Sequence, residues 1–154
     1  MRRIVLRLMV IGFGAVPLTA VAAGQKSPHF TDHLLRALVQ TRGSSSTYVY
    51  EVHSKPFGNG AGVLVGKSTS STTGTTRGVI YFASGAVRSV TTYRIAPEPN
   101  GVLRVTSTGH DTGLSGVFKG LHGSVHATGT QDPNTHIVTL TATGTLGPLI
   151  AHDK

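Results

Sequence analysis

The sequence lacks cysteine and tryptophan altogether, and acidic residues are scarce in its 154 residues. Without cysteine the chain can form neither disulfides nor thiolate metal sites, so a folded domain must rely on its own core. Aspartate and glutamate number 6 against 14 lysines and arginines, which gives a net charge of +8. Because these charges are scattered and aromatic residues are few, we expect a solvated basic surface and no nucleic-acid partner.

The N-terminus has the pattern of a secretory signal peptide. Arg2, Arg3 and Arg7 precede a short apolar run, and the small residues of segment 20–23 follow it. A positive start, an apolar centre and a small-residue cleavage site are typical of such peptides. A membrane anchor is the less favoured alternative, because the apolar run is short and Pro17 interrupts its end. We predict a signal peptide over residues 1–23 and a secreted or periplasmic mature protein without membrane contact.

One short helix is expected after the signal peptide. Thr31 is suited to cap a helix over Asp32–Gln40, and Phe30 can pack against Leu35. Its apolar stripe consists of Leu34, Leu35, Leu38 and Val39. We therefore predict that residues 24–43 form an N-terminal segment whose helix covers one end of the domain that follows.

Residues 44–150 alternate between strand-like stretches and clusters of turn residues, with no helical pattern between them. The strands expected from this pattern are Ser46–Ser54, Ala61–Ser68, Arg77–Ser84, Val87–Ile95, Val102–Ser107, Gly113–Lys119, Gly123–Gln131 and His136–Leu146. Eight is the number of strands that closes a small barrel. The fold class is therefore all-β, an eight-stranded antiparallel up-and-down β-barrel that is calycin-like. The Ser/Thr tract 68–76 fits either a mobile loop or two extended strand ends.

The last two strands carry the clearest pattern. Val138 and Leu140 alternate with threonines, as in a half-buried strand. The preceding Asp132-Pro-Asn-Thr135 is a turn sequence. With Pro133 and Asn134 at the tip, Ala127 faces Leu140, His126 points outward and His136 points inward. The two strands then agree on their apolar face, whose small residues suit a tight barrel interior.

Several site-like patterns are better explained as structural. Ala61–Ser68 fits a relaxed phosphate-loop pattern, but its Val-Leu-Val centre forms strands and no helix follows. His29 with His33, and His122 with His126, have the spacing of metal ligands without a supporting carboxylate or thiol constellation. We expect neither a metal nor a cofactor.

Glu51 is the acidic residue of most interest. In segment 48–53, tyrosines and Val52 occupy one face, whereas Val49, Glu51 and His53 occupy the other. If the second face lies in solvent, as periodicity alone favours, Glu51 is an ordinary surface carboxylate. If it lies inside the barrel, desolvation raises the pKa of Glu51 and the carboxyl can transfer a proton.

Two segments carry a resemblance to a known family. Thr112–Val125, which reads TGLSGVFKGLHGSV, resembles the signature segment of the allene oxide cyclase barrel family, to which dirigent proteins are related. Val49–Val52 is similar to the opening strand of the cyclases. The resemblance implies an eight-stranded barrel, commonly trimeric, with a mostly apolar cavity. Cyclases of this family close a five-membered ring in a fatty-acid epoxide, and dirigent proteins steer the coupling of phenolic radicals. The resemblance makes Glu51 the acidic cavity residue, His53 its partner and Phe118 a large inward anchor.

The resulting hypothesis is an exported barrel that encloses a small apolar or phenolic molecule. If it is an enzyme, it is an isomerase or cyclase in which Glu51 and His53 are catalytic. The expected ligand contacts are Val49, Phe118, Val138 and Leu140. The expected assembly is a homotrimer. A non-catalytic small-ligand carrier and a structural surface barrel are the alternatives.

Overall fold

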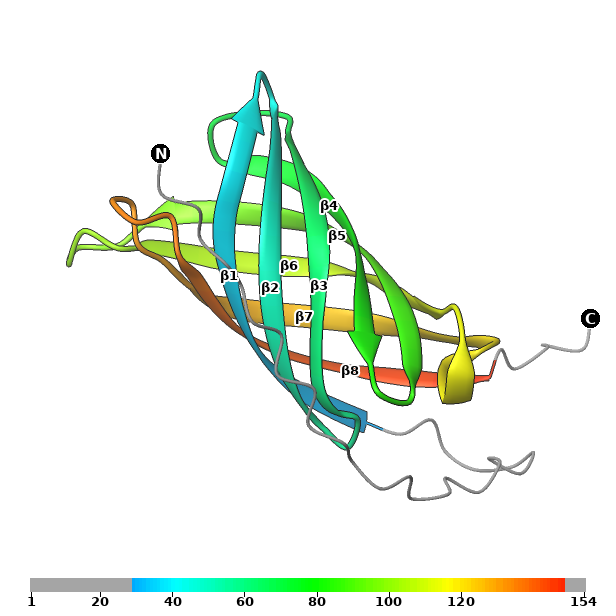
Figure 1. The fold of residues 1–154 in the computed structure, drawn as a ribbon. Coiled ribbons are helices and arrows are strands. Elements are labelled where there is room, and N and C mark those ends of the chain that lie inside the picture. Colours follow the sequence, from blue (N-terminus) through cyan, green and yellow to red (C-terminus); the bar gives the residue numbers. More distant parts are fainter. Residues whose placement is uncertain (1–28, 149–154) are drawn as a thin grey trace, which may run out of the picture.

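Eight antiparallel strands close into a barrel over residues 29–148, the part of the chain that the computed structural model describes (Figure 1). The strands are β1 (His29–Arg42), β2 (Ser45–Lys55), β3 (Gly58–Ser68), β4 (Thr73–Phe82), β5 (Gly85–Pro97), β6 (Leu103–Gly113), β7 (Leu121–Gln131) and β8 (Val138–Pro148). Each strand pairs with the next, and β8 pairs with β1. The predicted all-β up-and-down barrel is confirmed. The predicted signal peptide lies outside the described residues, among which no helix could cross a membrane.

The predicted helix over Asp32–Gln40 is wrong, because these residues form most of β1. Phe30, Asp32 and Leu34 are buried while the residues between them are more exposed, which is the period of a strand. The apolar pattern was ambiguous because β1 carries apolar residues on both faces, with Leu35 outward and Leu34 inward. Pairing with β2 on one side and β8 on the other outweighs the local helical pattern. The barrel thus begins at residue 29 rather than 44.

The predicted strand Gly113–Lys119 is also wrong. It contains the end of β6 and a loop with the 3₁₀ turn η1 (Gly116–Phe118). The predicted number of eight strands is still correct, because one predicted strand does not exist and β1 was not predicted. The Ser/Thr tract resolves into the ends of β3 and β4, joined by the four residues 69–72.

In the β7–β8 hairpin the same side chains of the two strands point inward as predicted, but the pairing register differs from the prediction by two residues. Ala127 pairs with Ala142 instead of Leu140. The connection is longer than a two-residue tip: Asp132 Oδ1 accepts the N–H of Asn134 at 2.7 Å, and His136 adopts a φ of 56°. His136 is exposed in this loop, so its predicted inward orientation is wrong. A shift of two keeps the same side chains inside, since the strand period is two.

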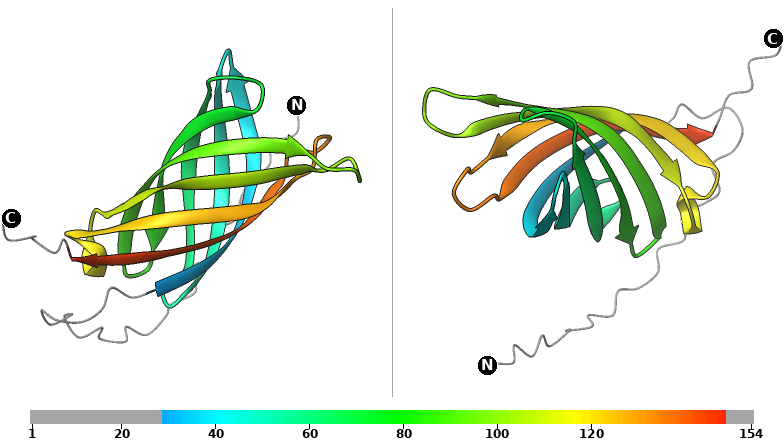
Figure 2. Two further views of the ribbon diagram at one scale, coloured as in Figure 1. Left: turned by 180° about the vertical axis from the view of Figure 1, so that it is seen from behind. Right: turned by 90° about the horizontal axis from the view of Figure 1, so that it is seen from above.

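The two ends of the barrel differ. At one end, here called the closed end, Phe30, Phe57, Phe82 and Phe118 pack together, with centroids of Phe57 and Phe118 5.0 Å apart. At the other, here called the open end, lie the β1–β2, β3–β4, β5–β6 and β7–β8 connections. Figure 2 shows the β5–β6 and β7–β8 hairpins far from η1. One end of the interior is therefore plugged by aromatic rings and the other is not.

The loop after β6 holds the plug in place. Val117 N–H donates to the Ser84 carbonyl at 3.0 Å, and Ala86 N–H donates to Ser115 Oγ at 3.1 Å. Gly116 adopts a φ of 60°, and a Cβ on it would lie 2.0 Å from the Ser84 carbonyl oxygen. The glycine-rich segment thus brings this loop close to the β4–β5 turn and inserts Phe118 into the barrel.

Candidate functional site

The barrel interior is layered, and the pairing of β1 with β8 gives the order. From the closed end to the open end, the pairs are Phe30 with Gly144, Asp32 with Ala142, Leu34 with Leu140, and Arg36 with Val138. An aromatic layer is followed by a layer containing a carboxyl group, then an apolar layer, then a layer containing a guanidinium. Charged groups inside a barrel with an apolar core mark the places where the interior can do chemistry.

The structure separates the residues that sequence reasoning grouped into one site. Val49, Glu51 and His53 all point outward from β2, and Val49 is 46% exposed. His53 Nδ1 lies 2.9 Å from Asn59 Oδ1 on the outer surface. The interior placement of Glu51 is therefore wrong, and the solvent placement favoured by periodicity is right. Val49 cannot contact a ligand held inside.

Phe118, Val138 and Leu140 do lie inside the barrel, but in three different layers. Phe118 is fully buried in the aromatic plug. Leu140 is buried in the apolar layer opposite Leu34. Val138 borders a cavity at the open end. Of the predicted ligand contacts, Val138 alone borders this cavity.

The cavity at the open end, here called the mouth pocket, has a volume of about 50 Å³. Its apolar lining comes from four strands and consists of Leu64, Ile95, Val105 and Val138. Its polar lining comes from Arg36, Ser46, Tyr48, Ser68, Thr76, Tyr93 and Gln131. Such a volume holds a few water molecules, or one functional group with a short apolar stem. A larger ligand would extend outward between the loops of the open end.

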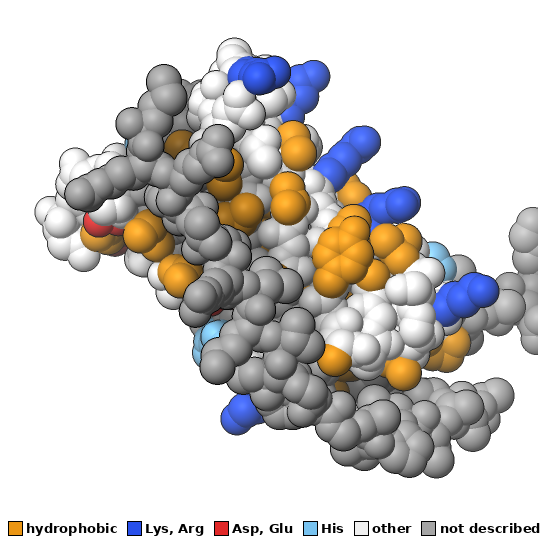
Figure 3. Space-filling view, viewed as in Figure 1, with side chains coloured by type: hydrophobic (Ala, Val, Ile, Leu, Met, Phe, Trp, Pro, Cys, Tyr) orange, Lys and Arg blue, Asp and Glu red, His pale blue; other side chains and the backbone are white. Residues whose placement is uncertain are grey.

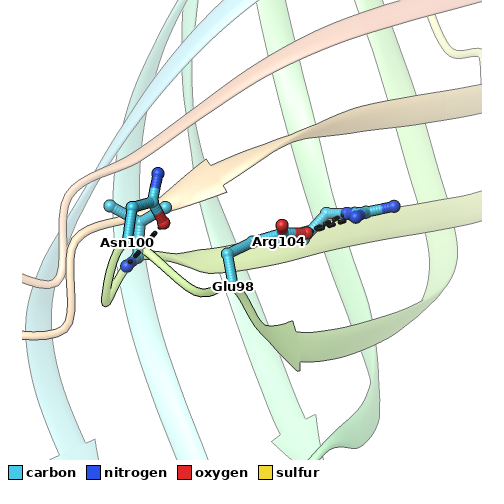
Figure 4. A network of polar contacts seen from close by, with 4 residues as sticks. Glu98, Asn100 and Arg104 are labelled. Atoms are coloured by element: carbon cyan, nitrogen blue, oxygen red, sulfur yellow. Dashed lines mark hydrogen bonds and ion pairs between the residues drawn. The ribbon is translucent and has the colours of Figure 1, made fainter.

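Arg36 is the charged group of the mouth pocket. Burial lowers the pKa of its guanidinium, and the neighbouring Tyr50 and Tyr48 offset part of that effect. An arginine remains protonated in such surroundings because its intrinsic pKa is very high. Its Nε is buried and has no hydrogen-bond partner. Within residues 29–148, the single ion pair joins Arg104 to Glu98 at the β5–β6 loop (Figure 4).

A second, smaller cavity of about 10 Å³ lies against the aromatic plug and is lined by Asp32 and Asp111. Both residues are 6% exposed, and each has one carboxyl oxygen without a hydrogen-bond partner. Burial raises the pKa of Asp32 from 3.8 to about 6. Burial also raises the pKa of Asp111 to about 6, with a further contribution from the charge of Asp32. Two carboxyls that titrate near neutrality can each donate or accept a proton.

Sequence reasoning missed both aspartates and Arg36. Asp32 and Arg36 were missed because the segment was predicted to be a helix. In a strand they share the inward face with Phe30 and Leu34. Asp111 falls between the predicted strands Val102–Ser107 and Gly113–Lys119, in a segment expected to form a turn, whereas it belongs to β6. Once the strands are known, the period of two places all three side chains inside.

The histidines of the described strands lie mostly on the outer surface of the barrel. His110 and His126 are exposed on the outer face of β6 and β7, and His33 is exposed on β1. No group of three or more metal-ligating side chains occurs in the part of the chain that the structure describes. The phosphate-loop-like segment Ala61–Ser68 lies within β3, in agreement with its structural interpretation.

No family model matches the chain, and comparisons with curated proteins and with solved structures gave no match. The resemblance of Thr112–Val125 to the allene oxide cyclase family therefore stays a prediction. The geometry of the interior carries the functional argument.

Proposed function

We propose that this barrel binds one small molecule with an apolar or phenolic body in the mouth pocket. The observation that carries the proposal is an interior cavity at the unplugged end that is lined by both apolar and polar side chains. Small-molecule sites in proteins commonly have this composition, and the mouths of β-barrels are frequent places for them. The aromatic plug supports the proposal because it leaves the open end as the entrance.

A second candidate function is isomerisation or cyclisation of the bound molecule by proton transfer. The acid pair of Asp32 and Asp111 favours it, because both carboxyls are buried, near neutrality in pKa and have a free oxygen. Because Glu51 and His53 face solvent, the two aspartates are the residues proposed to transfer protons inside the barrel. A substrate would have to displace the apolar layer of Leu34 and Leu140 to reach them. Asp111→Asn abolishes turnover if this function is correct, and leaves ligand binding intact.

Assembly into a homotrimer is also part of the proposal. Large apolar residues are exposed on adjacent strands β1 to β4, among them Leu35, Val49, Val63, Val65 and Tyr81. Val49 pairs with Val63, and Val63 with Val79, so these side chains form a continuous outer row. Figure 3 shows apolar side chains gathered over this face with lysines and arginines beside them. Exposed patches of this kind mark contact surfaces.

Native mass spectrometry of the protein purified gently from its own host tests binding and assembly together. We expect a trimer that carries an additional small apolar or aromatic mass. A bare single chain, unchanged after addition of fatty acids or phenols, would contradict the proposal and favour a structural surface barrel. Export is expected to show as removal of residues 1–23 in the same mass measurement.

A further inference from the structure

The mouth pocket contains the half-buried guanidinium of Arg36, which forms no ion pair within the described barrel. Arg36 points inward from β1, opposite Tyr50 of β2 and Val138 of β8. Every other lysine or arginine of the described residues is exposed on the outer surface or in a loop. The inward orientation of Arg36 is therefore particular to this position rather than a consequence of the basic composition.

A cation that is partly withdrawn from water is normally paired with an anion, since desolvation penalises an isolated charge. Arg36 forms no ion pair in the described barrel, and its Nε has no hydrogen-bond partner. The interior carboxyls do not serve as partners. Asp32 lies two inward positions away, beyond Leu34, which corresponds to roughly 13 Å along a strand. Arg36 is thus available to a group that enters through the open end.

The surroundings of Arg36 define what that group is. Tyr48, Tyr93 and Ser68 offer hydroxyl groups, and the Tyr93 hydroxyl lies 3.1 Å from Ser68 Oγ. Leu64, Ile95 and Val105 offer apolar surface. A guanidinium presents two parallel N–H donors that match the two oxygens of a carboxylate. One cation, neighbouring hydroxyls and an apolar lining fit a monoanionic head attached to an apolar or aromatic body.

We propose that Arg36 receives the carboxylate of the ligand, so that the barrel selects apolar or aromatic carboxylic acids. The head lies in the mouth pocket and the body points toward the open end, because the pocket volume of about 50 Å³ encloses only the head and a short stem. This inference rests on the proposed small-molecule function and adds the chemical class of the ligand.

Isothermal titration of the full chain with octanoate, 1-octanol and octylammonium tests the inference, with cinnamate and cinnamyl alcohol as an aromatic pair. We expect each carboxylate to bind the native protein at least tenfold more tightly than its alcohol, and octylammonium not to bind. Arg36→Gln removes this preference while the alcohols bind as before. Arg36→Lys keeps the charge without the planar donors and retains part of the preference. Arg77→Gln is the charge-matched control, because Arg77 is exposed on the outer face of β4.

The outcomes separate the inference from the function on which it rests. Equal affinity for acids and alcohols in the native protein would overturn the carboxylate assignment and leave small-molecule binding intact. An unchanged preference in Arg36→Gln would also overturn it, as would an equal loss in Arg77→Gln. If none of the five compounds binds, the proposed function itself fails. The comparison of acids with alcohols uses the native chain, so it holds even if an Arg36 variant fails to fold.

Discussion

The acid pair beside the plug makes the barrel less stable as the pH rises. Asp111 is 6% exposed, and burial raises its pKa from 3.8 to about 6. The folded protein therefore binds more protons than the unfolded chain between these two values, and stability falls as the pH rises through that window. Substitution of Asp111 by Asn removes the charge and retains the shape of the side chain. We expect Asp111→Asn to stabilise the barrel at neutral and alkaline pH.

The size of the effect follows from the pKa values. A difference between 3.8 and about 6, at 1.36 kcal/mol for each unit, gives a free energy of unfolding that is about 3 kcal/mol higher for the variant above pH ~7. This gain should be small at pH ~4 and vanish below pH ~3, where Asp111 is protonated in both states. Part of it is offset because the asparagine amide also requires hydrogen-bond partners in the interior.

Urea unfolding followed by circular dichroism at pH about 4, 6 and 8 measures this difference. Glu51→Gln is the matched control, since Glu51 is an exposed carboxyl on the outer face of β2. All other ionisable residues are common to the native chain and the variants, so their contribution cancels in the comparison. A stability difference between Asp111→Asn and the native chain that is the same at all three pH values would refute the reasoning.

Three further outcomes are expected. Phe118→Ala should lower the free energy of unfolding by about 3–5 kcal/mol, because Phe118 is fully buried against Phe57 and Phe82; the thermal midpoint would show it. Gly123→Ala should be strongly destabilising in the same assay, since its Cβ would lie 1.6 Å from the Thr145 carbonyl oxygen. Val63→Lys should convert the assembly to single chains in light scattering, whereas Thr141→Lys on the outer face of β8 should not.

The strands with one polar and one apolar face were predictable, and β8 is the clearest case. Val138 and Leu140 alternate with threonines that face water, so the period of two is visible in the sequence. β1 was not predictable in this way. Its outer face carries Leu35 and Val39, which are exposed at 48% and 61%, so apolar residues occur on both faces and imitate a helical stripe. The outer face of β1, which is proposed to contact other copies of the chain, is therefore the face that obscured the strand pattern of this segment.

The candidate site depended on the same distinction. Arg36 and Asp32 were invisible as interior groups because the segment that carries them was taken as a helix. Glu51 drew attention through a resemblance of four residues, although its alternation with Tyr50 and Val52 already indicated solvent. Periodicity was the more reliable guide at this position, because side-chain direction in a strand follows from backbone geometry alone.

NMR of the isotopically labelled protein titrated with octanoate tests most directly whether a ligand binds in the mouth pocket. We expect saturable shifts of signals from Tyr48, Leu64 and Val105, which line the pocket, while Phe82 in the plug and Val49 on the outer face do not move. Shifts confined to outer-face residues such as Val49 and Val63, or no saturable shifts at all, would contradict a function based on the interior of the barrel.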